Sequence, residues 1–460
     1  MRKTLIYVIL SAGAAMSFLQ SCQLGRHYVR PSLNLPVYID SLNHDSMSIA
    51  DVPWQVVYPD TTLQKMIRKT LDNNKDLMIA AARVKELAEM KRIDFANLFP
   101  KVGVNTYMEK EGLDEGGEKY SNSNKFYMKA SVTWELDLWG NLRWAKDKSM
   151  AEFLGSIENQ RALQMSMIAQ MAQSYFELVS LDNELSIVRK TVEARRKSLH
   201  LTKIRYMGGL TNETPFRQAQ VELARTMTLV PDLEKKVAKK QNEIAFMMGE
   251  YPHDIERSSI HDDVVLPNTL PVGLPSKLLE RRPDIRKAEQ ELVAANAAVG
   301  IAYTNLFPRL SLTASGGSES KELENMLKSP YHIISGSLLT PVFNMGKNRA
   351  QLKAKKAAYE QAVLSYEKSV LNAFREASNA IIEFNKSHEI YKTRLHLERA
   401  SKSSLDLAKL QYINGVIAYL DLLDAQRSYL DAQIGLSNSI RDKHIAIVNL
   451  YKALGGGWNG

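Results

Sequence analysis

The sequence predicts a mainly α-helical protein with a small β part, built from two copies of a unit that joins a β-hairpin to a long helical hairpin. Three observations support this prediction. The second half of the chain repeats the first, one segment alternates apolar and polar residues without a fault, and helical spacing of apolar residues continues far beyond the length of an ordinary helix.

The internal repeat is visible as a motif that returns 206 positions later. The pattern Ser-Leu-x-Leu-x-Lys-x-x-Tyr-x-x-Gly occupies 198–209 and again 404–415. Upstream, Asn-Leu-Phe-Pro at 97–100 returns at 305–308, an offset of 208. A long unit that keeps its register is a duplicated structural module, and duplication within one chain suggests pseudosymmetry in the assembly.

The repeat divides the chain into six expected segments. They are a signal peptide (1–21), an irregular N-terminal segment (22–60), a first repeat (61–249), a linker rich in Pro and polar residues (250–276), a second repeat (277–455) and a short C-terminal tail (456–460).

The N-terminus has the pattern of a bacterial lipoprotein signal. Arg2 and Lys3 precede an apolar stretch too short to span a bilayer, and a small residue stands just before Cys22. Cys22 is the only cysteine, so an internal disulfide is impossible. A free buried cysteine is the alternative, but the position favours lipidation of Cys22, and Gln23 after it fits sorting to the outer membrane.

The strongest strand prediction covers residues 125–138, where seven apolar positions recur with period two. Weaker alternation at 101–110, 309–316 and 333–343 completes two β-hairpins, 101–138 and 308–343, with exposed loops expected at 111–124 and 317–331. Four strands are too few to close a barrel, whereas three chains would supply twelve. The alternative is a soluble sheet with one buried face.

Helical spacing fills the rest of both repeats. Long helices are expected at 141–207 and 347–412, each about 90–100 Å at the usual rise, with returning helices at 213–248 and 418–453. Pro231 should kink the first return because it removes a backbone donor. The alternative is a cytosolic coiled-coil scaffold, which would show the same heptads but would need neither a signal peptide nor alternating strands.

Composition excludes several classes of function. The net charge of +9 is spread over the chain without the basic clusters of a nucleic-acid groove. No apolar run after the signal is long enough for a transmembrane helix, which leaves a peripheral protein or a β-barrel. No catalytic, nucleotide-binding or metal-ligating motif occurs, so we expect no enzyme activity, cofactor or metal site.

Residues 273–286 read Gly-Leu-Pro-Ser-x-Leu-Leu-Glu-Arg-Arg-Pro-Asp-Ile-Arg, followed by Ala-Ala-Asn-Ala-Ala at 294–298. Together with Leu-Trp-Gly at 138–140, they closely resemble the signature of the TolC-like outer membrane efflux family, in its lipoprotein (OprM/NodT-type) branch that serves RND multidrug pumps. The resemblance covers nearly the whole mature chain. It implies a homotrimer with a 12-stranded transmembrane β-barrel on a periplasmic α-barrel.

The resemblance also implies a periplasmic gate. Asp421 and Asp424 lie three apart on one helical face and match the family's gate aspartates, and Tyr412 matches a gate tyrosine. In a trimer each aspartate would form a ring of three carboxylates that favours cations. Taken alone, the two acidic residues could instead simply complement a helix N-terminus.

Two departures from the family qualify this gate. Pro215 and Gln218 hold the equivalent positions in the first repeat, so the carboxylates belong to the second hairpin only. Ile417 replaces the family's basic gate residue, so we expect a latch that depends on Tyr412, backbone contacts and packing rather than on an ion pair.

The hairpin turns are the expected contact points for an adaptor protein, because a Gly with small apolar neighbours can nest against a partner's tip. These residues are Gly209, Leu210, Thr211, Gly415, Val416 and Ile417. The alternative is a plain helix stop, for which the Gly suffices.

The function expected from these observations is a passive exit duct in the outer membrane. It would be lipid-anchored, extend into the periplasm and receive small molecules from an inner-membrane RND-type pump through a periplasmic adaptor, with no nucleic-acid partner. The same duct could serve type I protein or peptide secretion, and a lipid-tethered coiled-coil scaffold in the periplasm is a third possibility.

Overall fold

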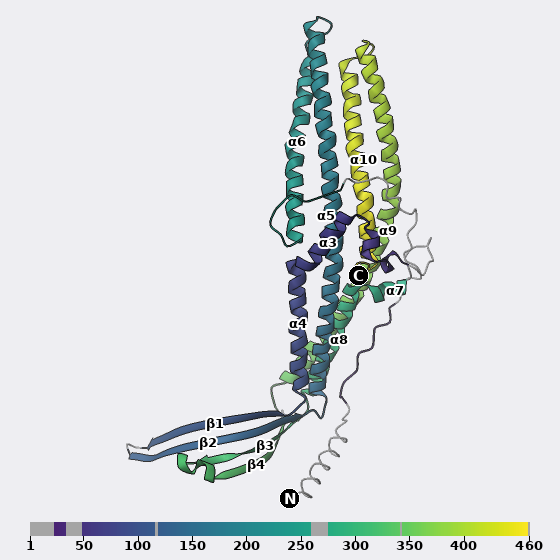
Figure 1. Cartoon of the computed structure of the whole chain (residues 1–460). Helices are drawn as coiled ribbons and strands as arrows, with labels where there is room; N and C mark the ends of the chain where they lie inside the picture. Colours follow the sequence, from purple (N-terminus) through teal and green to yellow (C-terminus); the bar gives the residue numbers. More distant parts are fainter. Residues whose placement is uncertain (1–22, 34–47, 116–117, 259–274, 341–342, 459–460) are drawn as a thin grey trace. The chain divides into compact units, whose positions relative to one another are not determined.

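The computed structural model describes residues 23–33, 48–115, 118–258, 275–340 and 343–458 (Figure 1). Its elements, in chain order, are η1 (Ile49–Asp51), α2 (Trp54–Val57), α3 (Thr61–Asn73), α4 (Lys75–Ala96), β1 (Lys101–Glu115), β2 (Glu118–Leu136), α5 (Asn141–Met207), α6 (Thr214–Met247), α7 (Pro275–Arg281), α8 (Pro283–Thr304), β3 (Arg309–Ser320), η2 (Leu323–Lys328), β4 (Pro330–Leu339), α9 (Lys347–Ile413) and α10 (Tyr419–Ala453).

The four long helices confirm the helical prediction almost to the residue. α5 and α9 have 67 residues each, and α6 and α10 return after short turns. α6 continues through Pro231 as one helix of 34 residues. In the N-terminal segment that was expected to be irregular, η1 and α2 form two short helical turns.

The β part is one antiparallel sheet in the order β1-β2-β3-β4. The loops expected at 111–124 and 317–331 are wrong in extent: β1 continues to Glu115, β2 begins at Glu118 and β3 reaches Ser320. Polar residues continue these strands because ladder hydrogen bonds join backbone groups and do not require apolar side chains. β4 begins at Pro330 and ends at Leu339, earlier than the predicted 343.

The register gives the sheet two different faces. Val102 lies opposite Val132 and Val132 opposite Ala314, and the even-numbered positions around them carry the apolar side chains. Lys101, Thr133 and Thr313 align on the other face, which is rich in hydroxyl groups. Alternation along every strand therefore produces one apolar and one polar surface.

The chain forms two compact units, and each takes segments from both repeats. The first contains the sheet and the adjoining helical segments, within Met1–Leu33, Ala82–Ile157 and Arg286–Lys368. The second contains the rest of the helical part, within Asn34–Ala81, Glu158–Ile285 and Ser369–Gly460. Of the four long helices, α5 and α9 begin in the first unit and continue into the second, whereas α6 and α10 belong to the second unit alone.

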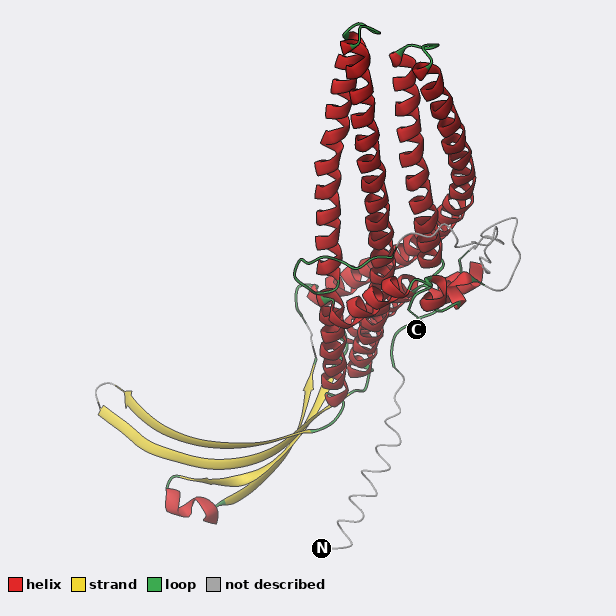
Figure 2. Cartoon of the chain, turned by 45° about the horizontal axis from the view of Figure 1, so that its top comes forward, coloured by secondary structure: helices red, strands yellow, loops and turns green. Residues whose placement is uncertain are grey.

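Within the second unit the two helical hairpins lie side by side (Figures 1 and 2). Leu185 and Val188 of α5 pack against Leu233 of α6, with Ile434 of α10 beside them. The Asn183 amide donates to the Ser437 hydroxyl at 2.9 Å, which joins α5 to α10. Burial of this apolar seam stabilises the contact between the hairpins.

The start of α3 in this unit is held by a three-residue network. Asp60 caps the helix by accepting from the backbone N–H of Thr62 at 2.8 Å, and its other oxygen accepts from the hydroxyls of Tyr175 and Ser258. Burial raises the pKa of Asp60, but these hydrogen bonds lower it more, so the carboxyl stays ionised.

Candidate periplasmic gate

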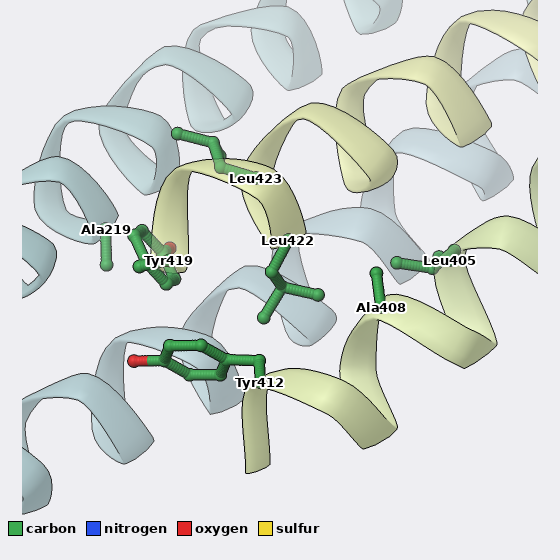
Figure 3. Packing of buried hydrophobic residues seen from close by; sticks show 7 residues of the cluster. All are labelled: Ala219, Leu405, Ala408, Tyr412, Tyr419, Leu422 and Leu423. Carbon is green, nitrogen blue, oxygen red and sulfur yellow. The ribbon is translucent and has the colours of Figure 1, made fainter. Parts of the chain in front are cut away.

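The free end of the hairpins in the second unit is closed by a cluster of buried side chains (Figure 3). Tyr412 at the end of α9 and Tyr419 at the start of α10 meet edge to face, with ring centroids 5.6 Å apart. The other members are Ala219, Leu405, Ala408, Leu422 and Leu423. Tyr412, predicted as a gate residue, is therefore part of a core that fastens the second hairpin's turn to α6.

Tyr412 is 4 % exposed, and burial raises the pKa of its phenol. Its hydroxyl has no hydrogen-bond partner among the residues that the structure describes. The ring, rather than the hydroxyl, therefore makes the stabilising contacts of this side chain.

Arg205, near the end of α5, connects the first hairpin to the same place. Its Nη1 atom donates to the backbone oxygens of Tyr412 and Ile413, both at 3.3 Å, and its guanidinium lies 5.0 Å from the Tyr412 ring centroid. A cation at the C-terminal end of α9 complements the negative end of the helix dipole. No motif or spacing in the sequence indicated this contact.

The two predicted gate aspartates have different surroundings. Asp421 accepts a hydrogen bond from the backbone N–H of Ala418 at 3.0 Å and so caps the start of α10, as the alternative interpretation required. Asp424 is 65 % exposed and lies 3.5 Å from Nη1 of Arg427. Asp421 thus has a structural role besides its charge, whereas Asp424 is mostly exposed and contacts only the side chain of Arg427 among the ion pairs of the described residues.

A buried ionic cluster lies next to these residues. Glu222 of α6, whose side chain is 5 % exposed, accepts from Arg427 of α10 and lies 3.9 Å from Arg195 of α5. Arg195, 3 % exposed, also donates to Gln426 of α10. Each hairpin therefore contributes charged groups to one buried site.

The hydrogen bond from Arg427 lowers the pKa of Glu222, and it does so more strongly than burial raises it. Burial lowers the pKa of Arg195, but an arginine remains charged at any physiological pH. Removing one partner from such a group would leave an uncompensated buried charge.

Ile417 packs against the buried tyrosine cluster, as an apolar residue should. Near it, the two hairpins are joined by the ion pair between Arg427 and Glu222 and by the hydrogen bond from Arg205 to the backbone oxygen of Tyr412. That the latch lacks an ion pair from position 417 itself stays a prediction.

The turns end both hairpins in the same way. Gly209 (φ 67°) and Gly415 (φ 73°) occupy the left-handed region, and the next residues close the turn through Leu210 N–H to Arg205 O and Val416 N–H to Gln411 O, both 2.9 Å. Leu210 and Val416 are 72 % and 69 % exposed. Thr211 and Ile417 are half-buried, so Leu210 and Val416 are the more exposed apolar side chains directly after each Gly.

The described residues hold no group of three or more His, Cys, Asp or Glu side chains placed to bind a metal ion. None of the described helices has a stretch apolar enough to cross a membrane. Cys22, the expected lipidation site, lies outside the described residues.

Comparison with known proteins shows which proteins this chain resembles. The chain is 27 % identical over 447 residues to the cation efflux system protein CusC of Escherichia coli O6:H1, covering 96 % of each chain. It is 32 % identical over 410 residues to the solvent efflux pump outer membrane protein SrpC of Pseudomonas putida, covering 87 % of each.

The solved structure of the outer-membrane channel OprN matches with a TM-score of 0.88 at 28 % identity, over 95 % of this chain and all of that one. The model of the outer membrane efflux protein family matches twice, at residues 66–250 and 274–456, which are the two repeats seen in the sequence. The chain therefore belongs to the outer membrane efflux protein family and is an outer membrane efflux channel.

Proposed function

We propose that this chain assembles as a homotrimer whose sheets close into one 12-stranded transmembrane β-barrel. The observation that carries the proposal is the two-faced sheet: its apolar face suits lipid and its hydroxyl-rich face suits a water-filled lumen. Within the described chain, β1 and β4 each pair on one side only. If β1 of one copy pairs with β4 of the next around three copies, the backbone hydrogen-bonding groups of both edge strands are paired, and no strand edge is exposed to lipid.

The trimer acts as a passive exit duct for small molecules. A periplasmic adaptor and an inner-membrane RND-type pump supply the substrate and the energy, since the sequence contains no nucleotide-binding motif. The adaptor contacts the hairpin tips at residues 209–211 and 415–417. Exposed Leu210 and Val416, each beside a Gly without a side chain, give a partner's helical tip both an apolar contact and room for close approach.

The gate is formed by Asp421, Asp424 and Tyr412 of each copy. Rings of carboxylates around the trimer axis repel one another and attract cations, so they restrict passage and favour positive ions. The buried Glu222–Arg427 contact and the Arg205–Tyr412 contact hold the second hairpin against the first in the closed state. Opening requires these contacts to break or to move together.

Acyl chains on Cys22 anchor the channel beside its sheet. The residues that follow are fixed to the junction of β2 and α5: Leu24 N–H donates to Trp139 O at 3.1 Å, and Trp144 Nε1 donates to Leu24 O at 2.8 Å. Gln23 adds a hydrogen bond to Asp147 at 3.1 Å. The lipid is thereby tethered close to where the strands end.

Planar-bilayer conductance of the purified mature protein, with cross-linking to count subunits, tests the proposal. Discrete cation-selective openings from a trimer are expected. A monomer or dimer that never conducts, even after the gate aspartates are replaced, would refute it.

A further inference from the structure

The junction between β4 and α9 is the most strongly charged exposed segment that the proposed channel leaves without a role. Residues 347–356 contain five basic residues and no acidic one, an exception to the even spread of charge along the chain. All five side chains are exposed, and none has an ion pair or hydrogen bond within the described part of the chain. We call residues 343–356 the basic junction; its cations are Lys347, Arg349, Lys353, Lys355 and Lys356.

Two large apolar side chains precede these cations. Phe343 is 82 % exposed and Met345 is 85 % exposed, although both lie just after a strand. Within α9, Arg349, Lys353 and Lys356 recur at i, i+4 and i+7 and so share one helical face. Lys347 and Arg349 lie in the first turn of α9, where positive charge is unfavourable beside the positive end of the helix dipole, so an anionic partner would stabilise them.

In the first repeat, the charged groups at the equivalent strand-to-helix junction are neutralised within the chain. At the offset of 206, Asp137 corresponds to Phe343 and Arg143 to Arg349. Asp137 pairs with Arg143 Nε at 3.0 Å and also accepts from the backbone N–H groups of Leu142 and Arg143. The second repeat has replaced this neutralising carboxylate by an exposed aromatic ring.

A second pair of equivalent residues repeats the contrast. Trp139 donates its Nε1 proton to Pro308 O at 2.7 Å and packs on Phe307, whereas its counterpart Met345 is exposed. Asp147, which accepts from Gln23, corresponds to Lys353. The first junction is satisfied within the chain, and the second presents apolar and positive side chains outward.

The geometry points to anionic phospholipid headgroups, at the periplasmic-side surface of the outer membrane, as the partner of the basic junction. The apolar face of β4 leads directly to it, because Ile334 and Leu338 on that face are 85 % and 64 % exposed. Phe343 and Met345 enter the headgroup boundary, and the cations bind phosphates. The inference rests on the proposed insertion of the sheet into the membrane.

Binding of this kind would fix the depth of the channel. Lys and Arg side chains keep their heads at the phosphate level while their stems cover apolar surface. With Cys22 tethered at the first junction and headgroups bound at the second, both strand-to-helix transitions would be held at the same membrane surface. Only the second would depend on the charge of the lipid.

The test compares two triple variants of the full mature protein. Arg349→Gln with Lys353→Gln and Lys356→Gln removes the shared cationic face. Lys392→Gln with Arg399→Gln and Lys402→Gln is the matched control, because these residues have the same charges, are also exposed, and lie in the part of α9 that belongs to the second unit. Dioctanoyl-phosphatidylglycerol and dioctanoyl-phosphatidylcholine are titrated onto each detergent-purified protein and bound lipid is counted by native mass spectrometry.

The wild type and the control variant should prefer phosphatidylglycerol by about ten-fold or more at low salt, and the first variant should lose this preference. Phe343→Asp, which restores the carboxylate of the first repeat, should weaken it as well. Unchanged preference in the first variant, or equal loss in the control, would overturn the inference. Loss of trimers with unchanged lipid preference would also overturn it and would assign the surface to a second copy of the chain.

If the first variant does not fold, the salt dependence of lipid binding by the wild type tests the inference. Raising NaCl from about 0.05 to 0.5 M should abolish its preference for phosphatidylglycerol, because screening weakens exposed charges. A preference that is insensitive to salt would exclude the basic junction as its origin. Conductance of the wild type tests the channel separately, so failure of lipid binding in a conducting trimer leaves the proposed function standing.

Discussion

Arg427 on α10 donates a hydrogen bond to Glu222 on α6, and this ion pair joins the two helical hairpins beside the tyrosine cluster. The Glu222 side chain is 5 % exposed, whereas Arg427 is 40 % exposed and also approaches Asp424. A buried carboxylate is thus linked, through one arginine, to a carboxylate at the proposed gate. This arrangement makes the contact sensitive to changes at the tip.

Glu222→Gln should loosen the second hairpin. Loss of the charge leaves Arg195 buried without its carboxylate, and we expect a cost of about 2 kcal/mol, below the range for a fully buried pair because Arg427 is partly solvated. Amide exchange over residues 419–430 should then be about thirty-fold faster. Glu234→Gln on the same helix, which breaks the exposed pair with Arg189, is the control and should change little.

The same residue predicts how the tip responds to acid. Glu222 has a lowered pKa in the folded protein, so its stabilising contribution is complete above the unfolded pKa of about 4.3 and is lost as the pH falls through the lowered value. Between pH 7 and 5 Glu222 stays ionised, so it should cause no change in the amide exchange rate at the tip once intrinsic rates have been corrected for. A transition in that range that disappears in Glu222→Gln would contradict the assignment.

Two substitutions of Tyr412 distinguish the contribution of its ring to stability from that of its hydroxyl. Because the buried hydroxyl has no partner among the described residues, Tyr412→Phe should change stability by less than about 1 kcal/mol and keep the stacking of Arg205. Tyr412→Ala should cost about 3–5 kcal/mol through the cavity it creates, and should raise the open probability in bilayers. Equal effects of the two substitutions would mean that the hydroxyl, not the packing, holds the tip.

Hydrophobic periodicity was enough to predict most of the fold. α5 occupies the predicted range of 141–207 without a change, because a long amphipathic pattern leaves few alternatives. The outer ends of β1 and β2 were missed because their side chains are polar, and the backbone pairing that continues the strands has no signature in side-chain hydrophobicity.

The candidate site was only half predictable. Tyr412 and the two aspartates were proposed from the resemblance of a local motif to the family, but Arg427 and Glu222 are 205 residues apart and share no pattern. Contacts of this kind depend on the packing of two hairpins, which a single sequence does not specify. The same holds for Arg205, whose partners are backbone oxygens of another helix.

Two double variants distinguish the charge of the proposed gate aspartates from the helix-capping role of Asp421. Asp421→Ala with Asp424→Ala should lower cation selectivity, measured as the reversal potential in a KCl gradient, because it removes both carboxylates of the proposed gate. Asp421→Asn with Asp424→Asn should lower it equally, while the amide oxygen introduced by Asp421→Asn can still accept from Ala418 N–H. Only the alanine variant should fray the start of α10 in hydrogen exchange. Unchanged selectivity in both variants would remove the aspartates from the gate.

Two adjacent arginines at the junction of α7 and α8 should differ sharply in their contribution to stability. Arg282 is 4 % exposed and binds Asp284 at 2.7 Å, Glu376 at 2.6 Å and the Ala453 backbone oxygen at 3.0 Å, so one side chain ties the start of α8 to α9 and to the end of α10. Its neighbour Arg281 forms its ion pair with Asp51, which is 50 % exposed.

Arg282→Ala should therefore destabilise the second unit by about 3 kcal/mol, since the end of α10 loses a buried charged donor. Arg281→Ala should cost no more than about 1 kcal/mol, because exposed pairs gain little over solvation. Hydrogen exchange at residues 446–453, compared between the two variants, measures the difference at the place where it arises. If both alanines had the same effect, the packing of Arg281 and Arg282 against Gly455, rather than the ionic contacts of Arg282, would be what holds the end of α10.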